Sequence, residues 1–138
     1  MSEYVVGDKM PSITHQITQN KINLFEACAI AERQNVHNDA GIAAQRFGTS
    51  QPIASGRMSI AYASEALRRF LGPEAFNTTG KVNLKFLRPV KEGDSVLVRG
   101  EVTEIAEEAG GRQVTVEVRC ENQNGDLTAV GQGSALLP

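Results

Sequence analysis

The sequence contains no apolar run that approaches the roughly 20 residues a membrane-spanning helix requires. Its first residues, MSEYVVGDKM, also lack the basic start and apolar core of a secretion signal. These absences predict a protein that stays in the cytoplasm without a membrane partner. The 14 Lys and Arg are scattered among 16 Asp and Glu, so no basic stripe is available for nucleic acid. We therefore expect no nucleic-acid partner.

Cysteine is also scarce, and the two that occur do not form a motif. Cys28 and Cys120 lie far apart and have no CxxC or Cys/His spacing. This usage argues against a disulfide framework and against a metal cage. We expect both cysteines to be small residues of the core, and we expect no metal or other cofactor.

The chain is long enough for one moderate core. With 138 residues, of which 41% are hydrophobic, it has a common single-domain size, and no repeat or low-complexity linker divides it. We therefore expect one domain over residues 1–138. Helical patterns occupy roughly the first half of this domain, and strand patterns dominate the second.

The first half opens with an alternating segment over residues 12–18 that predicts a short strand. Thr18 is a suitable cap for the helix that follows. Asp39 is placed to cap a second short helix, which Gly48 ends. The apolar face of the first helix is expected at Ile22, Leu24, Phe25, Cys28 and Ala29.

A longer helix is predicted from Ser55-Gly56 to Gly72-Pro73, where a left-handed glycine followed by proline ends it. Small side chains on its apolar stripe would let a sheet approach closely. The stripe consists of Ile60, Ala63, Ser64, Leu67 and Leu71.

From Lys81 onward the pattern alternates as strands do. Turns are expected at Gly93-Asp94 and Gly110-Gly111, and Asn124-Gly125 predicts a tight hairpin because both residues tolerate positive φ. The sum is an antiparallel sheet with one long helix available to cover it, an α+β fold.

Two features carry candidate chemistry. His37 lies five residues after Glu32 on a polar stretch, and a carboxylate and an imidazole that share one water are the minimum equipment for acid/base work. Alternatively, this stretch is a solvated loop whose histidine bonds to backbone.

Ser55-Gly56 opens the long helix, where unpaired N–H groups favour developing negative charge. Alternatively, Ser55 is an ordinary N-cap.

Taken in order, these segments resemble the MaoC-like (R)-specific enoyl-CoA hydratase/dehydratase family. The family loop reads Asp, any residue, Asn, Pro, an aliphatic and His, followed two positions later by Asp, and it is similar to residues 32–39 here. The family's Pro-Ile-Ala-His-Gly resembles residues 52–56, and further matches fall at residues 85–90, 92–94 and 122–125. The resemblance covers nearly the whole chain and implies a single hot-dog fold, an antiparallel sheet wrapped around one long central helix.

This chain departs from the family pattern at the residues that matter most. Glu32 stands where the family has its catalytic Asp, Gln34 replaces Asn, and Ser55 replaces the His before glycine, whereas His37 and Gly56 are retained. A longer carboxylate moves its oxygens by roughly an ångström, a displacement that can cost about 100-fold in rate. The site is therefore either re-spaced for a different acyl group or weakened.

The resemblance implies that Glu32 and His37 are catalytic and share a water that adds to an enoyl thioester. Gly56 would bind the thioester oxygen, with Ser55, Gln34 and Ser64 as further substrate contacts. The implied substrate is a thioester of coenzyme A or acyl carrier protein. Arg57 and Arg88 lie near the motifs, and cations can bind coenzyme phosphates there, but we expect both to be solvated.

Two other functions remain open. A thioesterase of the same fold would carry its acid on the long helix, where Glu65 is the only carboxylate well inside. A non-catalytic or weakly active acyl-binding subunit would instead pair with an active partner. In either case a lone sheet leaves pairing edges exposed, so we expect a homodimer joined edge to edge, with each site at the interface.

Overall fold

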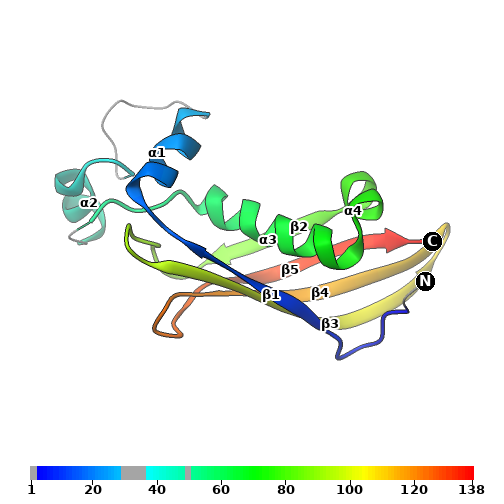
Figure 1. Ribbon diagram of the computed structural model, residues 1–138. Helices are drawn as coiled ribbons and strands as arrows, with labels where there is room; N and C mark the ends of the chain where they lie inside the picture. The colour runs from blue at the N-terminus through cyan, green and yellow to red at the C-terminus, as the bar shows by residue number, and fades with distance from the viewer. Residues whose placement is uncertain (1–2, 29–36, 49–50) are drawn as a thin grey trace.

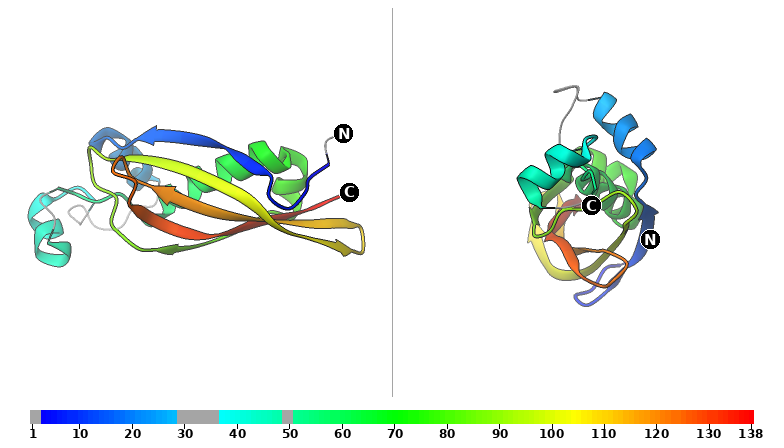
Figure 2. Two further views of the ribbon diagram at one scale, coloured as in Figure 1. Left: turned by 90° about the horizontal axis from the view of Figure 1, so that it is seen from below. Right: turned by 90° about the vertical axis from the view of Figure 1, so that its left-hand side faces the viewer.

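The computed structural model describes residues 3–28, 37–48 and 51–138 (Figure 1). Its centre is a five-stranded antiparallel sheet in the order β1-β3-β4-β5-β2, with β1 and β2 at the edges. The strands curve around the long helix α3, and the shorter helices α1 and α2 lie beyond its N-terminal end (Figure 2). The predicted α+β arrangement of one antiparallel sheet around one long helix is thereby confirmed. The strands are β1 (Lys9–Gln16), β2 (Lys81–Phe86), β3 (Ser95–Glu108), β4 (Gly111–Glu121) and β5 (Leu127–Leu137).

The two short helices begin where their caps were predicted. In α1 (Gln19–Ala27) the Thr18 hydroxyl accepts the backbone N–H of Lys21 at 3.1 Å. In α2 (Ala40–Phe47) the carboxylate of Asp39 accepts the N–H of Ile42 at 3.0 Å, and Gly48 ends the helix at φ 68°. These caps were predictable because a side-chain oxygen satisfies helical N–H groups whatever the rest of the fold does.

The predicted apolar face of α1 is partly wrong. Ile22 is fully buried, but Leu24 and Cys28 are exposed, and Ala29 lies outside the described residues. Residues 22 and 24 point about 200° apart around a helix, so a helix that packs along one side cannot bury both. Cys120 is in the core as expected, and burial raises the pKa of its thiol to about 11.

The long helix α3 (Gly56–Leu71) packs into the concave face of the sheet through Ala63, Leu67 and Leu71. The sheet contributes to this close approach, because a Cβ at Gly133 of β5 would lie 2.2 Å from Leu67 Cδ1. Gly72 ends α3 as predicted, but its ψ of 136° places it outside the left-handed helical region.

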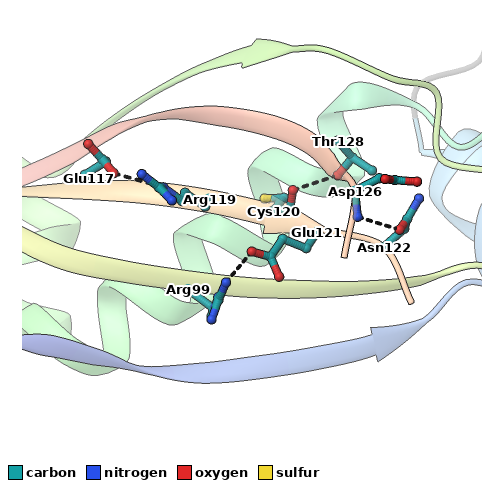
Figure 3. Close-up of polar contacts among 8 residues, drawn as sticks. All are labelled: Arg99, Glu117, Arg119, Cys120, Glu121, Asn122, Asp126 and Thr128. Atoms are coloured by element: carbon teal, nitrogen blue, oxygen red, sulfur yellow. Dashed lines mark hydrogen bonds and ion pairs between the residues drawn. The ribbon is translucent and has the colours of Figure 1, made fainter. Parts of the chain in front are cut away.

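The sequence patterns missed one helix and misjudged one turn. Pro73 occupies the first turn of α4 (Pro73–Thr79), a position that suits proline. The loop after β4 is longer than the predicted tight hairpin, and within it Gly125 alone has positive φ. The Asn122 side chain accepts the N–H of Asn124 at 2.9 Å and that of Asp126 at 3.0 Å. Figure 3 shows the second of these bonds. Asn122 therefore shapes a five-residue turn. β1 begins at Lys9 rather than at residue 12, because a bulge between Met10 and Ile13 interrupts the alternation.

The inner face of the sheet contributes alternating small apolar side chains to the core. These are Val96, Val98, Val102, Val114, Val116, Val118, Ala129 and Ala135. The outer face carries ion pairs: Arg99 of β3 pairs with Glu121 of β4, and Arg119 pairs with Glu117 at 3.0 Å within β4 (Figure 3). None of the described helices is long and apolar enough to cross a membrane.

A polar cluster joins the edge strand β1 to α3. His15 Nε2 lies 2.7 Å from Glu65 Oε1, the His15 ring stacks on Tyr62 at 4.1 Å, and Arg69 bonds to the other Glu65 oxygen at 3.1 Å. The His15 hydrogen bond holds the pKa of Glu65 below its ordinary value of 4.5. Burial opposes this shift with a smaller effect, and the Arg69 charge adds to it. The ionised carboxylate is thus favoured by the folded state.

We expect Glu65→Gln to lower stability only where the parent carboxylate is ionised. Because the folded pKa lies below the unfolded value of 4.5, the stabilisation is present above pH 4.5 and is lost as pH falls through the folded pKa. Such a partly exposed cluster contributes about 0.5 kcal/mol. Thermal unfolding over a series of pH values from 7 downward checks this, since the parent and the variant should differ at pH 7 and the difference should shrink as pH falls below 4.5.

Candidate functional site

A cavity of about 360 Å³ lies at the N-terminal end of α3. Its walls are residues 53–56, which lead into the helix, and residues 86–90, which follow β2, together with Ser59 and Thr128. The two wall segments are joined by backbone, because Ala54 N donates to the Val90 carbonyl at 2.7 Å and Ile53 forms a bridge with Lys91. The segment that follows β2 therefore fixes the backbone that precedes the helix.

Gly56, the first residue of α3, meets the wall opposite at very short range. A Cβ at this position would lie 2.7 Å from Phe86 Cζ and 2.8 Å from Phe86 Cε2. Only glycine lets the aromatic ring approach so closely. The first N–H groups of a helix have no partner within it, so the start of α3 presents donors and the positive end of the helix dipole beside the cavity.

His37 is anchored to the wall of the same cavity. Its Nδ1 lies 2.7 Å from the backbone carbonyl of Ile53, a residue that lines the cavity. A carbonyl oxygen can only accept, so Nδ1 is the donor, and in the neutral ring the lone pair is on Nε2. Gln19 of α1 also donates to the His37 carbonyl at 2.9 Å, which fixes the backbone of this residue. Nε2 is therefore the nitrogen able to take up a proton.

The structure brings together three of the predicted site residues. Ser55 and Gly56 line the cavity, and His37 bonds to its wall. Ser64 is half-buried and lies beyond the lining of this cavity, two turns further along α3. Glu32 and Gln34 lie outside the described residues. Ser55 is also the N-cap of α3, since its Oγ accepts the N–H of Arg57 at 3.2 Å.

Two polar residues of the cavity were missed from the sequence. Ser59 is buried and lies four residues after Ser55, so the helical spacing that places both on one face was a usable signal. Thr128 carried no such signal. Its hydroxyl donates to the Cys120 carbonyl at 3.2 Å across the turn-proximal ends of β4 and β5 (Figure 3).

The two arginines near the motifs differ in their surroundings. Arg88 is exposed and lines the cavity. Arg57 is 59% exposed at its side chain, yet its guanidinium lies close to Ser55 and to Glu26 of α1. Over the described ranges, no group of three or more His, Cys, Asp or Glu side chains is arranged to hold a metal ion.

Solved structures similar to this one span its whole length. R-hydratase PhaJ1 from Pseudomonas aeruginosa, in the unliganded form, is 31% identical, with a TM-score of 0.80 over 99% of this chain and 83% of its own. The (R)-hydratase from A. caviae involved in PHA biosynthesis is 24% identical, with a TM-score of 0.81 over 100% of both chains. These matches share one long helix packed in one antiparallel sheet, which is the hot-dog fold.

A more distant solved structure has the same fold but belongs to a different named superfamily. A hypothetical protein of the thioesterase superfamily from Thermus thermophilus is 17% identical, with a TM-score of 0.62 over 100% of this chain and 87% of its own. Because one fold hosts several activities, fold likeness alone does not assign a reaction.

The sequence itself gives a narrower match. None of the curated proteins compared with this chain matches it. The family model described as "MaoC like domain" matches residues 4–124, which include the His37 stretch, the start of α3 and most of the sheet. Together with the 31% identity to an R-hydratase over nearly all residues, this shows that the chain belongs to the MaoC-like family.

Proposed function

We propose that this chain catalyses the (R)-specific hydration of 2-enoyl thioesters and the reverse dehydration of 3-hydroxyacyl thioesters. The observation that carries the proposal is the 2.7 Å contact of His37 Nδ1 with the Ile53 carbonyl, at the wall of the cavity that Gly56 opens. It holds the imidazole next to the segment that leads into α3, a helix whose N-terminus suits a thioester oxygen. An acid/base group and an electrophilic anchor at one apolar cavity are what this reaction needs.

The proposed mechanism assigns one role to each group. His37 Nε2 takes a proton from water as the oxygen attacks C3 of the enoyl thioester, and the Gly56 N–H stabilises the negative charge that develops on the thioester oxygen. Glu32, which starts as the neutral acid, delivers its proton to C2 on the same face, and the proton taken up by His37 then passes to the Glu32 carboxylate, so that both groups return to their starting states. In dehydration the steps reverse, with His37 protonating the leaving hydroxyl. Ser55, Gln34 and Ser64 are the proposed further contacts to substrate.

The position of Glu65 favours this reaction over thioester hydrolysis. Glu65 is the carboxylate well inside α3, but it pairs with His15 and Arg69 on the β1 side of the helix. It does not line the cavity at the start of α3. A hydrolase that relied on this acid would need it near the thioester carbonyl.

Crotonyl-CoA separates the possible outcomes in one assay. Hydration removes the enoyl absorbance and releases no thiol, whereas hydrolysis releases free coenzyme A. Loss of absorbance without thiol supports the proposal, and thiol release would replace it with a thioesterase. If a panel of enoyl thioesters on coenzyme A and on acyl carrier protein binds but does not react, the chain is an acyl-binding subunit.

We further propose that residues 1–138 act as one domain and form a homodimer through the β2 edge. The β1 edge is unsuited to pairing, because Pro11 and a bulge interrupt it. The β2 edge leads into Phe86 and Leu87, which are 49% and 45% exposed and line the cavity. A second chain at this edge would cover both side chains and place the cavity at the interface.

Leu87→Glu should shift this dimer toward the monomer, because it buries a charge in the proposed interface. Light scattering at micromolar concentration should give about twice the chain mass of 14.9 kDa for the parent and a lower mass for the variant. Leu24→Glu is the matched control, since Leu24 is 63% exposed on α1, away from both sheet edges. A parent of single-chain mass would contradict the dimer.

A further inference from the structure

Glu26 of α1 is a partly buried carboxylate, with one fully buried oxygen, that the proposed mechanism does not use. Its side chain is 13% exposed. Its Oε1 is the only buried side-chain nitrogen or oxygen atom within the described residues that has no hydrogen-bond partner. Burial of an ionised oxygen without a hydrogen bond is costly, so a native group of this kind needs an explanation other than stability.

Glu26 pairs with Arg57, in the first turn of α3. Arg57 Nη2 lies 3.8 Å from Glu26 Oε2, and the guanidinium carbon lies 5.9 Å from the centre of the Phe25 ring. On its other side, Arg57 Nε donates to Ser55 Oγ at 3.4 Å. The guanidinium therefore lies between Glu26 and the cavity-lining Ser55, and α1 holds this otherwise exposed side chain.

The position of the Arg57 charge does not stabilise α3. A cation in the first turn repels the positive end of the helix dipole, and the first turn of α3 contains no acidic residue to offset it. The arrangement does hold a positive charge next to Ser55, one residue before Gly56. That is the point where negative charge develops on the thioester oxygen in the proposed reaction.

We propose that Glu26 is a positioning residue that acts through Arg57. Its carboxylate holds the guanidinium against Ser55, so that a fixed positive charge reinforces the N-terminal donors of α3 during the reaction. This inference rests on the proposed hydratase function. Glu26 itself touches neither the substrate nor the reacting atoms, and Arg57 acts on the thioester oxygen through its charge.

The test is a double-mutant cycle made of Glu26→Gln, Arg57→Met and both changes together, assayed by enoyl-CoA hydration. Each single change should lower kcat about tenfold, less than the loss on removing a direct oxyanion donor, and should leave KM nearly unchanged. Because Glu26 acts through Arg57, the double variant should be no slower than Arg57→Met alone. Equal effects of Glu26→Gln in both backgrounds would overturn the proposal.

Stability supplies the readout that separates positioning from a purely structural role. Glu26→Gln removes a buried charge with one unpartnered oxygen, so its Tm should equal or exceed that of the parent. A lower Tm together with a lower kcat would indicate a structural role instead. Glu65→Gln and Arg69→Met are matched controls, because they alter the Glu–Arg pair at the other end of α3 and should leave kcat unchanged.

The results also separate this inference from the function on which it rests. A parent that hydrates enoyl thioesters, with a Glu26→Gln variant equally fast, overturns the role of Glu26 alone. A parent that hydrates none of them overturns the proposed function, and the role of Glu26 with it.

Discussion

Replacement of His37 by alanine should slow enoyl-thioester hydration by about 100-fold or more, the range expected for a positioned acid/base. This corresponds to about 2.7 kcal/mol of transition-state stabilisation. The fold should survive, because His37 is half-buried in a turn outside the sheet and α3. The variant loses the Nδ1 contact to the Ile53 carbonyl, but the backbone bridge of Ile53 to Lys91 remains.

The chain offers an internal control for this prediction, since it contains only two histidines. His15 bonds to Glu65 on the β1 side of α3 and does not line the cavity. His15→Ala should therefore keep the rate of hydration. Initial rates with crotonyl-CoA, beside thermal unfolding of both variants, distinguish a lost proton transfer from a damaged fold. An unchanged rate in His37→Ala would remove this residue from the mechanism.

The parts of the fold that were predictable are those in which chemistry is local. Thr18, Asp39 and Gly48 act on backbone groups within a few residues of themselves, so helix boundaries could be inferred without knowledge of the fold. Period-2 alternation likewise identified the four strands after Lys81. The seven-residue helix α4 escaped detection because it buries only Phe76 and is too short to establish a helical period.

The parts that escaped prediction depend on how elements meet. Ser59 rather than Ser64 lines the cavity because the cavity lies at the first turn of α3, and the position of a cavity along a helix depends on the segments that pack around it. The pairing of Glu26 with Arg57 joins α1 to α3, so neither residue carries a signal in its own segment. Resemblance to a family identified His37 and Gly56, which this chain retains, but was silent on contacts that the family pattern lacks.

Glu32 replaces the catalytic Asp of the family pattern, which makes it the most consequential departure in this chain. Glu32→Gln should lower the hydration rate by about 100-fold or more. The amide keeps the shape of the side chain but can neither accept nor deliver the proton. Glu32 lies outside the described residues, so the prediction rests on its place in the family loop, five residues before His37. Glu74→Gln, an exposed acid on α4, is the control that should keep full activity.

Glu32→Asp then distinguishes a re-spaced site from a weakened one. If the longer acid is matched to this cavity, the shorter side chain withdraws its oxygens by roughly an ångström from the water shared with His37, and the rate should fall by up to about 100-fold. We expect this fall, because a working site must have been fitted to the residue it contains. A rise in rate would mean that Glu32 weakens the site and that Asp repairs it. Parent activity that survives Glu32→Gln would exclude this carboxylate from the chemistry.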